Sequence, residues 1–99
     1  MTGDKKVCSS EASSELPAPV ETAMTVNFGV VVDGYLFNAA RVGNVYTASL
    51  YFDHAQTITN GSTVVTPPCE EVFCAKGFRL VRSLNGADHY VVVTEYGDE

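Results

Sequence analysis

Residues 24–52 read MTVNFGVVVDGYLFNAARVGNVYTASLYF, and this stretch carries the strongest structural signal in the chain. Its first third alternates apolar and other residues with a period of two, which is typical of a strand with one buried face. Asp33-Gly34 and Gly43-Asn44 each suit a two-residue hairpin turn, because both central residues of such a turn need a positive φ. The stretch therefore predicts three antiparallel strands joined by two hairpins.

The two turns also predict which side chains share a face. The first turn places Val30 opposite Phe37, and the second places Leu50 opposite the same Phe37. The large apolar residues of three strands then lie on one face, and a slip of one residue would scatter them. The same register puts a second apolar row on the other face, formed by Val31, Leu36 and Tyr51, with Val42 and Val45 at its far end.

Two more hairpins and a helix are predicted beyond residue 52. Asn60-Gly61 predicts a turn that leads into a strand at 63–65. Thr66-Pro67-Pro68 resembles a helix start and Gly77 a helix end, so residues 67–76 are predicted to form a short helix.

Asn85-Gly86 predicts a C-terminal hairpin between residues 78–84 and 88–96. A two-residue turn there would put Arg82 and His89 on the same face as Leu80, which favours a longer loop with a bulge. The second strand carries three consecutive valines, which predicts an interior position in the sheet.

The predicted fold class is mainly β (α+β): an antiparallel meander of about four strands, one short helix and a C-terminal β-hairpin. A small, partly closed barrel is an alternative arrangement of these elements. Residues 1–21 are rich in Ser, Glu, Ala and Pro and are predicted to be a flexible leader. Residues 22–99 are predicted to form a single β-rich domain.

Charge narrows the range of partners. Twelve acidic and six basic residues give a formal net charge of −6. Direct binding to nucleic acid or to an anionic membrane is disfavoured, because phosphate contacts need Lys or Arg. The sequence shows neither an apolar run of the roughly 18 residues that span a bilayer nor a signal peptide, so a cytoplasmic protein is expected. The polar run after Cys8 suits a lipoprotein tether, but no apolar segment precedes it.

The cysteines and histidines give no catalytic or metal-binding pattern. Cys69 and Cys74 are separated by four residues, which is not the spacing of a common zinc motif, so free thiols are expected, with a disulfide or zinc as alternatives. His54 and His89 each follow an Asp, but neighbouring residues of a strand point to opposite faces. The sequence therefore predicts no enzyme and no cofactor; a small metal-binding or hydrolytic protein using His54, His89, Cys69 and Cys74 is an alternative.

A small acidic domain without a catalytic constellation is typical of a binding or inhibitory accessory protein that acts by protein–protein contact. Phage and mobile-element proteins of this size offer an analogy. The predicted partner-binding residues are those of the second apolar row and two glutamates: Val31, Leu36, Tyr51, Val42, Val45, Glu70 and Glu71. The alternative is that the helix or the C-terminal hairpin covers this row. A sheet edge is another predicted contact. A self-associating structural β module of a larger assembly, and thus a homo-oligomer, is an alternative.

Overall fold

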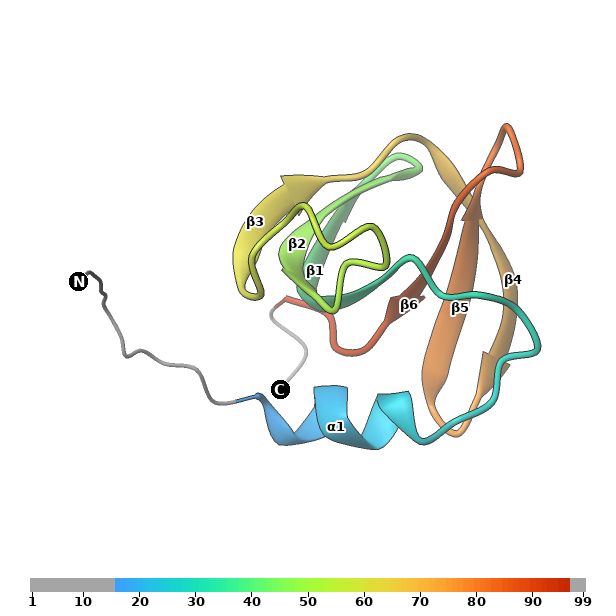
Figure 1. Cartoon of the computed structure of the whole chain (residues 1–99). Helices are drawn as coiled ribbons and strands as arrows, with labels where there is room; N and C mark the ends of the chain where they lie inside the picture. Colours follow the sequence, from blue (N-terminus) through green and yellow to red (C-terminus); the bar gives the residue numbers. More distant parts are fainter. Residues whose placement is uncertain (1–15, 97–99) are drawn as a thin grey trace.

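The computed structural model describes residues 16–96, which form one six-stranded mixed sheet and one short helix (Figure 1). The strand order is β3-β2-β1-β6-β5-β4; β1 and β6 are parallel, and all other neighbours are antiparallel. The mainly β prediction is confirmed, and the sheet is not closed into a barrel. The elements are α1 (Ala18–Met24), β1 (Gly34–Val42), β2 (Val45–Tyr51), β3 (Ser62–Val65), β4 (Cys69–Ala75), β5 (Phe78–Ser83) and β6 (His89–Val92).

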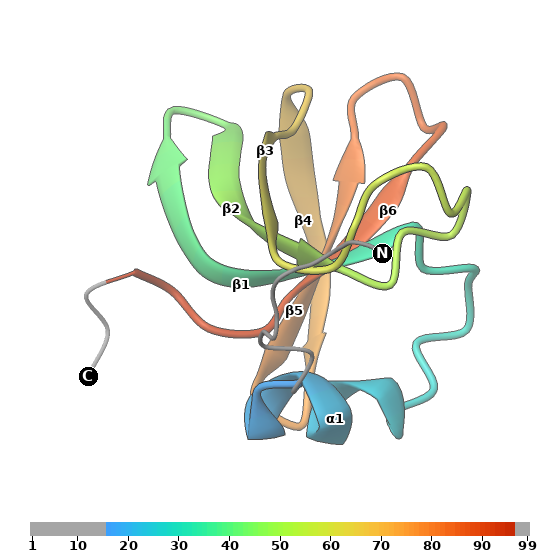
Figure 2. The same cartoon turned by 60° about the vertical axis from the view of Figure 1, so that its left-hand side comes forward.

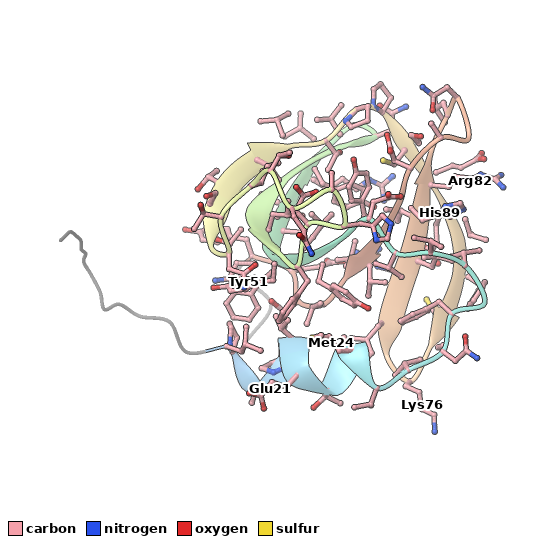
Figure 3. The ribbon with its side chains drawn as sticks, in the orientation of Figure 1. Glu21, Met24, Tyr51, Lys76, Arg82 and His89 are labelled. Atoms are coloured by element: carbon pink, nitrogen blue, oxygen red, sulfur yellow. The ribbon has the colours of Figure 1, made fainter. Side chains whose placement is uncertain are left out.

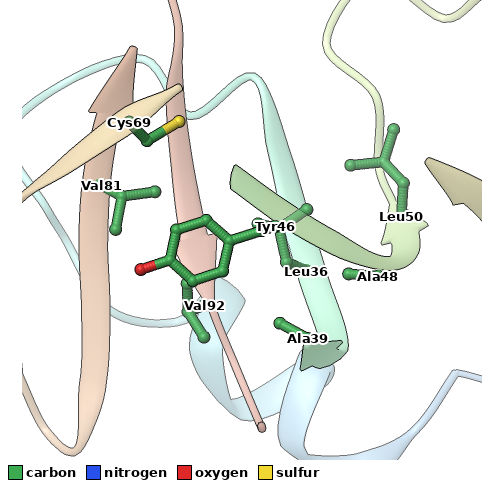
Figure 4. Packing of buried hydrophobic residues seen from close by; sticks show 8 residues of the cluster. All are labelled: Leu36, Ala39, Tyr46, Ala48, Leu50, Cys69, Val81 and Val92. Atoms are coloured by element: carbon green, nitrogen blue, oxygen red, sulfur yellow. The ribbon is translucent and has the colours of Figure 1, made fainter. Parts of the chain in front are cut away.

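The sheet curves so that one of its faces packs against itself (Figure 2). Side chains of β2 and β5 belong to the same buried cluster, although three strand spacings, roughly 14 Å in a flat sheet, separate these strands. Figure 4 shows the Tyr46 ring between Val81 and Val92 on one side and Leu36 and Ala39 on the other. We call this set the inner cluster: Leu36, Ala39, Tyr46, Ala48, Leu50, Cys69, Val81 and Val92.

The other face of the sheet is covered by α1 and by the segment that follows it. The helix begins after Pro17 with a proline in its first turn, a position where the missing N–H has no cost. Val20 and Ala23, three residues apart, lie on one side of the helix and are fully buried. Residues 18–21 therefore belong to the fold and not to a leader; residues 1–15 lie outside the described part. This outer cluster comprises Val20, Ala23, Phe28, Phe78, Leu80, Val91 and Val93.

The predicted strand at 24–32 does not form, and Asp33-Gly34 is not a hairpin turn. The period-two pattern is nevertheless real, since Val26, Phe28 and Val32 all pack on the outer cluster from a segment without a strand partner. Gly34 instead opens β1, where it pairs with β6. The pattern was right about the burial of Val26, Phe28 and Val32 but not about Met24 and Val30, which are exposed, nor about the strand.

The hairpin between β1 and β2 is confirmed, but its register changes part of the way along. Val42 lies opposite Val45, as the turn at residues 43 and 44 predicts. A bulge follows at residues 38 and 39, where Asn38 has a φ of 55°. Beyond it the pairs are displaced by one residue, so Leu36 faces Leu50 in the inner cluster. Phe37 lies opposite Ser49 and packs towards the outer cluster, which contradicts the predicted pairing of Phe37 with Leu50.

The predicted helix at residues 67–76 does not form, because Cys69–Ala75 is the strand β4. Lys76 and Gly77 both have positive φ, 55° and 85°, and form the tight turn that joins β4 to β5. The Thr66 hydroxyl accepts from the Tyr46 N–H and donates to the Pro67 carbonyl, so it does not cap a helix. This turn has a weak sequence signal, because Lys is uncommon at the first position of such a turn.

Two further predicted hairpins form, one between β2 and β3 and one between β5 and β6, but the second differs from the prediction in its register. β3 pairs with β2 and follows Asn60-Gly61, as predicted. The C-terminal hairpin is also confirmed, but β5 and β6 pair in the register of a two-residue turn, without the expected bulge. Arg82 and His89 do lie opposite each other, and Arg82 reaches outward to Glu70. β6 occupies an interior position between β1 and β5, which confirms the prediction from its valines.

Candidate functional site

The predicted apolar contact row does not exist as a surface. Leu36 is completely buried in the inner cluster, whereas Tyr51 packs on the opposite side of the sheet, where its ring meets Phe37 edge-to-face. Val31 is 60% exposed and lies outside any strand. Val42, exposed, and Val45, half-buried, remain together at the β1–β2 turn. The bulge in β1 separates these residues.

The two glutamates predicted to bind a partner lie on the edge strand β4, and both are engaged within the sheet. Glu70 forms an ion pair with Arg82 at 2.7 Å, and Glu71 lies 3.8 Å from Arg79. Figure 3 shows Arg82 at the margin of the sheet, close to His89 and far from α1. Arg82 therefore balances Glu70, whereas Arg79 is shared between Glu71 and Glu95, with which it also forms an ion pair.

A pocket of about 220 Å³ lies where the start of β1, the β2–β3 loop and the start of β6 meet. Three aspartates are among its lining residues, Asp33, Asp53 and Asp88. No Lys or Arg is among its lining residues. Its remaining wall is largely apolar and comprises Leu50, Ala55, Ile58, Val64, Val65 and Tyr90, with Thr66 and His54. We call this feature the acidic pocket.

Main-chain hydrogen bonds hold the three segments of the acidic pocket together. The Asp33 N–H donates to the His89 carbonyl at 2.7 Å, and the His54 N–H donates to the Asp33 carbonyl at 2.9 Å. The Asp33 carboxylate also accepts from the His89 N–H at 2.8 Å. Asp33 therefore ties the β2–β3 loop and the β5–β6 turn to the start of β1.

The Asp53 carboxylate organises the loop that forms one wall. One of its oxygens accepts from the N–H groups of Thr57 and Ile58 and from the Thr57 hydroxyl, at 2.8–3.0 Å. The main-chain bond from Thr57 is the largest of the contacts that lower the pKa of Asp53. Asp53 is therefore ionised at neutral pH and fixed in place.

The acidic pocket is negative throughout. Burial, followed by the charge of Asp88, raises the pKa of Tyr90 to about 12, and Asp33 and Asp53 add to the effect. Within residues 16–96, no ion pair joins any of the three aspartates to a Lys or Arg. Among residues 16–96, four carboxylates have no ion pair with an arginine: those of Asp33, Asp53 and Asp88, which line this pocket, and that of Glu21 on α1, which does not.

The pocket suits a cation larger than a metal ion. Across the described residues, no three His, Cys, Asp or Glu side chains are placed to hold one metal ion. The apolar wall can contact an alkyl chain while the carboxylates face a charged end, which is how Arg and Lys side chains are usually accommodated. Asp33, Asp53 and Asp88 are far apart in the sequence, so no sequence pattern pointed to this combination.

The cysteines and histidines of the alternative metal or hydrolytic site do not converge. Cys69 is a free thiol buried in the inner cluster, and Cys74 is a free, exposed thiol at the other end of β4. Burial raises the pKa of Cys69, and a hydrogen bond to Glu71 raises that of Cys74, so neither favours the reactive thiolate. His54 is exposed and His89 half-buried.

Comparisons with known proteins place this chain beside none of them: no protein-family model, curated protein or solved structure matches it. Within residues 16–96, α1 is too short to cross a membrane, and no other helix is present. The proposals below therefore depend on the geometry of the chain alone.

Proposed function

We propose that this domain is a non-enzymatic protein-binding module, and that its acidic pocket receives a basic side chain of a partner protein. The single observation that carries this proposal is that Asp33, Asp53 and Asp88 line one partly apolar pocket and that no Lys or Arg of residues 16–96 pairs with them. If the bound side chain belongs to the functional surface of the partner, binding would block that surface. The domain would then have an accessory or inhibitory role.

The chemistry of the pocket supports arginine as the preferred side chain. A guanidinium group carries five donors in a flat arrangement, so it can contact several separated carboxylates at once. An ammonium group is more strongly hydrated and gives up its water less readily. The alkyl part of the arginine would lie on Leu50, Ile58 and Val64.

The test uses a short capped peptide with one arginine and the same peptide with citrulline, which keeps the shape and removes the charge. Titration is followed by the amide NMR signals of the ¹⁵N-labelled full chain. The arginine peptide is expected to shift the signals of Asp33, His54, Asp88 and Tyr90. Raising the salt concentration should weaken the interaction, because the attraction is electrostatic.

A matched pair of charge-neutralising variants identifies the site. Asp88→Asn is the informative change, because no hydrogen bond of the fold to its carboxylate is seen among the described residues. It is expected to weaken arginine binding by about fivefold or more, the effect of removing one of several nearby charges. Glu21→Gln on α1 removes the same charge elsewhere and should leave binding unchanged. Equal binding of the arginine and citrulline peptides, or equal effects of both variants, would contradict the proposal.

A further inference from the structure

The edge strand β4 has an open side. It pairs with β5 on one side only, and no strand of residues 16–96 lies on its other side. Its seven residues exceed the four of β3, the other edge of the sheet. Val72 and Phe73 are each 40% exposed. A long edge strand with exposed apolar side chains is a template on which another strand can pair.

The charge along β4 is nearly balanced, although the whole chain carries −6. Arg82 pairs with Glu70, and Arg79 is shared between Glu71 and Glu95, so the charge of Glu71 is only partly compensated within one copy. Lys76 projects from the turn at the end of β4, away from the rest of the molecule (Figure 3). Two copies of this edge can therefore approach each other without strong local repulsion, whereas two acidic pockets cannot.

A bulge in β4 determines how the strand can pair with itself. The register with β5 passes from Glu71 opposite Val81 to Phe73 opposite Leu80, which leaves Val72 as the extra residue. Glu71 and Val72 therefore occupy one step of the strand together. When Glu71 and Val72 are counted as one position, the side chains alternate along the strand. Glu71 and Cys74 then lie on one side of the sheet, and Phe73 and Ala75 lie on the other.

Antiparallel pairing of two β4 strands about a twofold axis at Cys74 brings compatible side chains together on both faces of the joined sheet. It puts Phe73 of one copy opposite Ala75 of the second copy, and the Glu71–Val72 step opposite the second copy's Lys76. Phe73 and Ala75 then lie on the same side of the sheet, and Lys76 approaches the Glu71–Val72 step from the turn that ends β4. Two Glu71–Lys76 contacts form, one at each end of the contact, and the apolar residues lie between them.

We propose that a second copy of this chain pairs with the open side of β4, so that two sheets join across a twofold axis at Cys74. The charge complementarity between Glu71 and Lys76 sets the register. The contact is short, so the dimer is weak and depends on concentration. It is separate from the acidic pocket, so either proposal can fail without the other.

The first experiment measures association of the full chain by sedimentation equilibrium over a wide concentration range. Lys76→Glu makes Glu71 face a glutamate at both contacts, and Glu71→Lys makes Lys76 face a lysine. Each variant alone should associate about tenfold more weakly or worse, because like charges then oppose each other. An equimolar mixture of the two restores both opposite-charge contacts, and its affinity should return to within about threefold of the wild type. Asp88→Asn should leave association unchanged.

The second experiment tests the register. Opposed residues of an antiparallel pair have Cα atoms about 4.5–5.5 Å apart, which suits a disulfide. In a Cys8→Ser background with copper phenanthroline as the oxidant, Cys74 should link the two copies rapidly, and Cys74→Ser should abolish the link. Cys69 is buried and should not react. The inference would be overturned if the chain is a strict monomer at every concentration, or if its dimer has the same affinity in the charge variants as in the wild type. A strict monomer would mean that only a strand of a different protein could pair with this edge.

Discussion

Gly34 lies where β1 packs closely against Leu50 of β2, and its lack of a side chain makes this packing possible. The Asp33-Gly34 pair resembles a hairpin turn, yet Gly34 is a buried strand residue. A Cβ atom at this position would collide with Cδ1 of Leu50, so the glycine is needed for close packing of β1 on the inner cluster.

Gly34→Ala is therefore expected to lower the free energy of unfolding by about 2 kcal/mol, the usual cost of overpacking a core. Denaturant unfolding measures this difference. A second change, Leu50→Val, shortens the side chain that the new Cβ atom would meet. The double variant should therefore recover part of the lost free energy of unfolding. Simple addition of the two single effects would show that the contact between residues 34 and 50 is not the cause.

Tyr90 gives a residue-scale prediction about pH. Its pKa in the folded chain is raised to about 12, above the value of roughly 10 for an unfolded tyrosine. Between these values the unfolded chain loses its proton first, so the free energy of unfolding falls as the pH rises from about 10 towards 12. Absorbance of tyrosinate should show a late-titrating group that Tyr90→Phe removes. The stability of that variant should fall less over the same range, and an unchanged titration would contradict the assignment.

At the scale of elements, some predicted turns were right, whereas Asp33-Gly34 is not a turn and the turn at Lys76-Gly77 was not predicted. Gly43-Asn44 and Asn85-Gly86 lie in their hairpins as predicted, and in each pair the glycine supplies a positive φ. The bulge at Asn38 has no comparable signal, and it moved Leu36 from a predicted contact surface to the core. Residues 67–76 contain signals for a helix start and end, but pairing with β5 decides their conformation.

The β2–β3 loop provides a prediction for one element. Asp53→Ala removes the acceptor shared by Thr57 and Ile58, so exchange of their amide hydrogens should accelerate by about tenfold or more, as expected when a local anchor is lost. Thr59→Ala, in the same loop, is the control. Because the pKa of Asp53 is lowered by folding, the anchor persists above the ordinary pKa of Asp and is lost as the pH falls through its value in the folded chain. Equal exchange in both variants would exclude this role of Asp53.

At the scale of the whole molecule, the parallel pairing of β1 with β6 is what sequence analysis could not foresee. It joins residues more than fifty positions apart and has no local pattern. This pairing brings Asp33 beside Asp88 and so creates the acidic pocket. The fold class followed from hairpins that form locally, whereas the candidate site depends on contacts between distant segments.

The same sheet separates two clusters, and the second depends on a helix that lies partly in the predicted leader. Val20 is fully buried against β5 and β6 in the outer cluster, so Val20→Ala should lower the free energy of unfolding by about 2 kcal/mol. Thr22→Ala alters the exposed side of α1 and should change stability by no more than about 0.5 kcal/mol. A single unfolding transition shifted by Val20→Ala would show that α1 and the sheet unfold together. If both variants unfold like the wild type, α1 does not contribute to the core, and the fold would begin at β1.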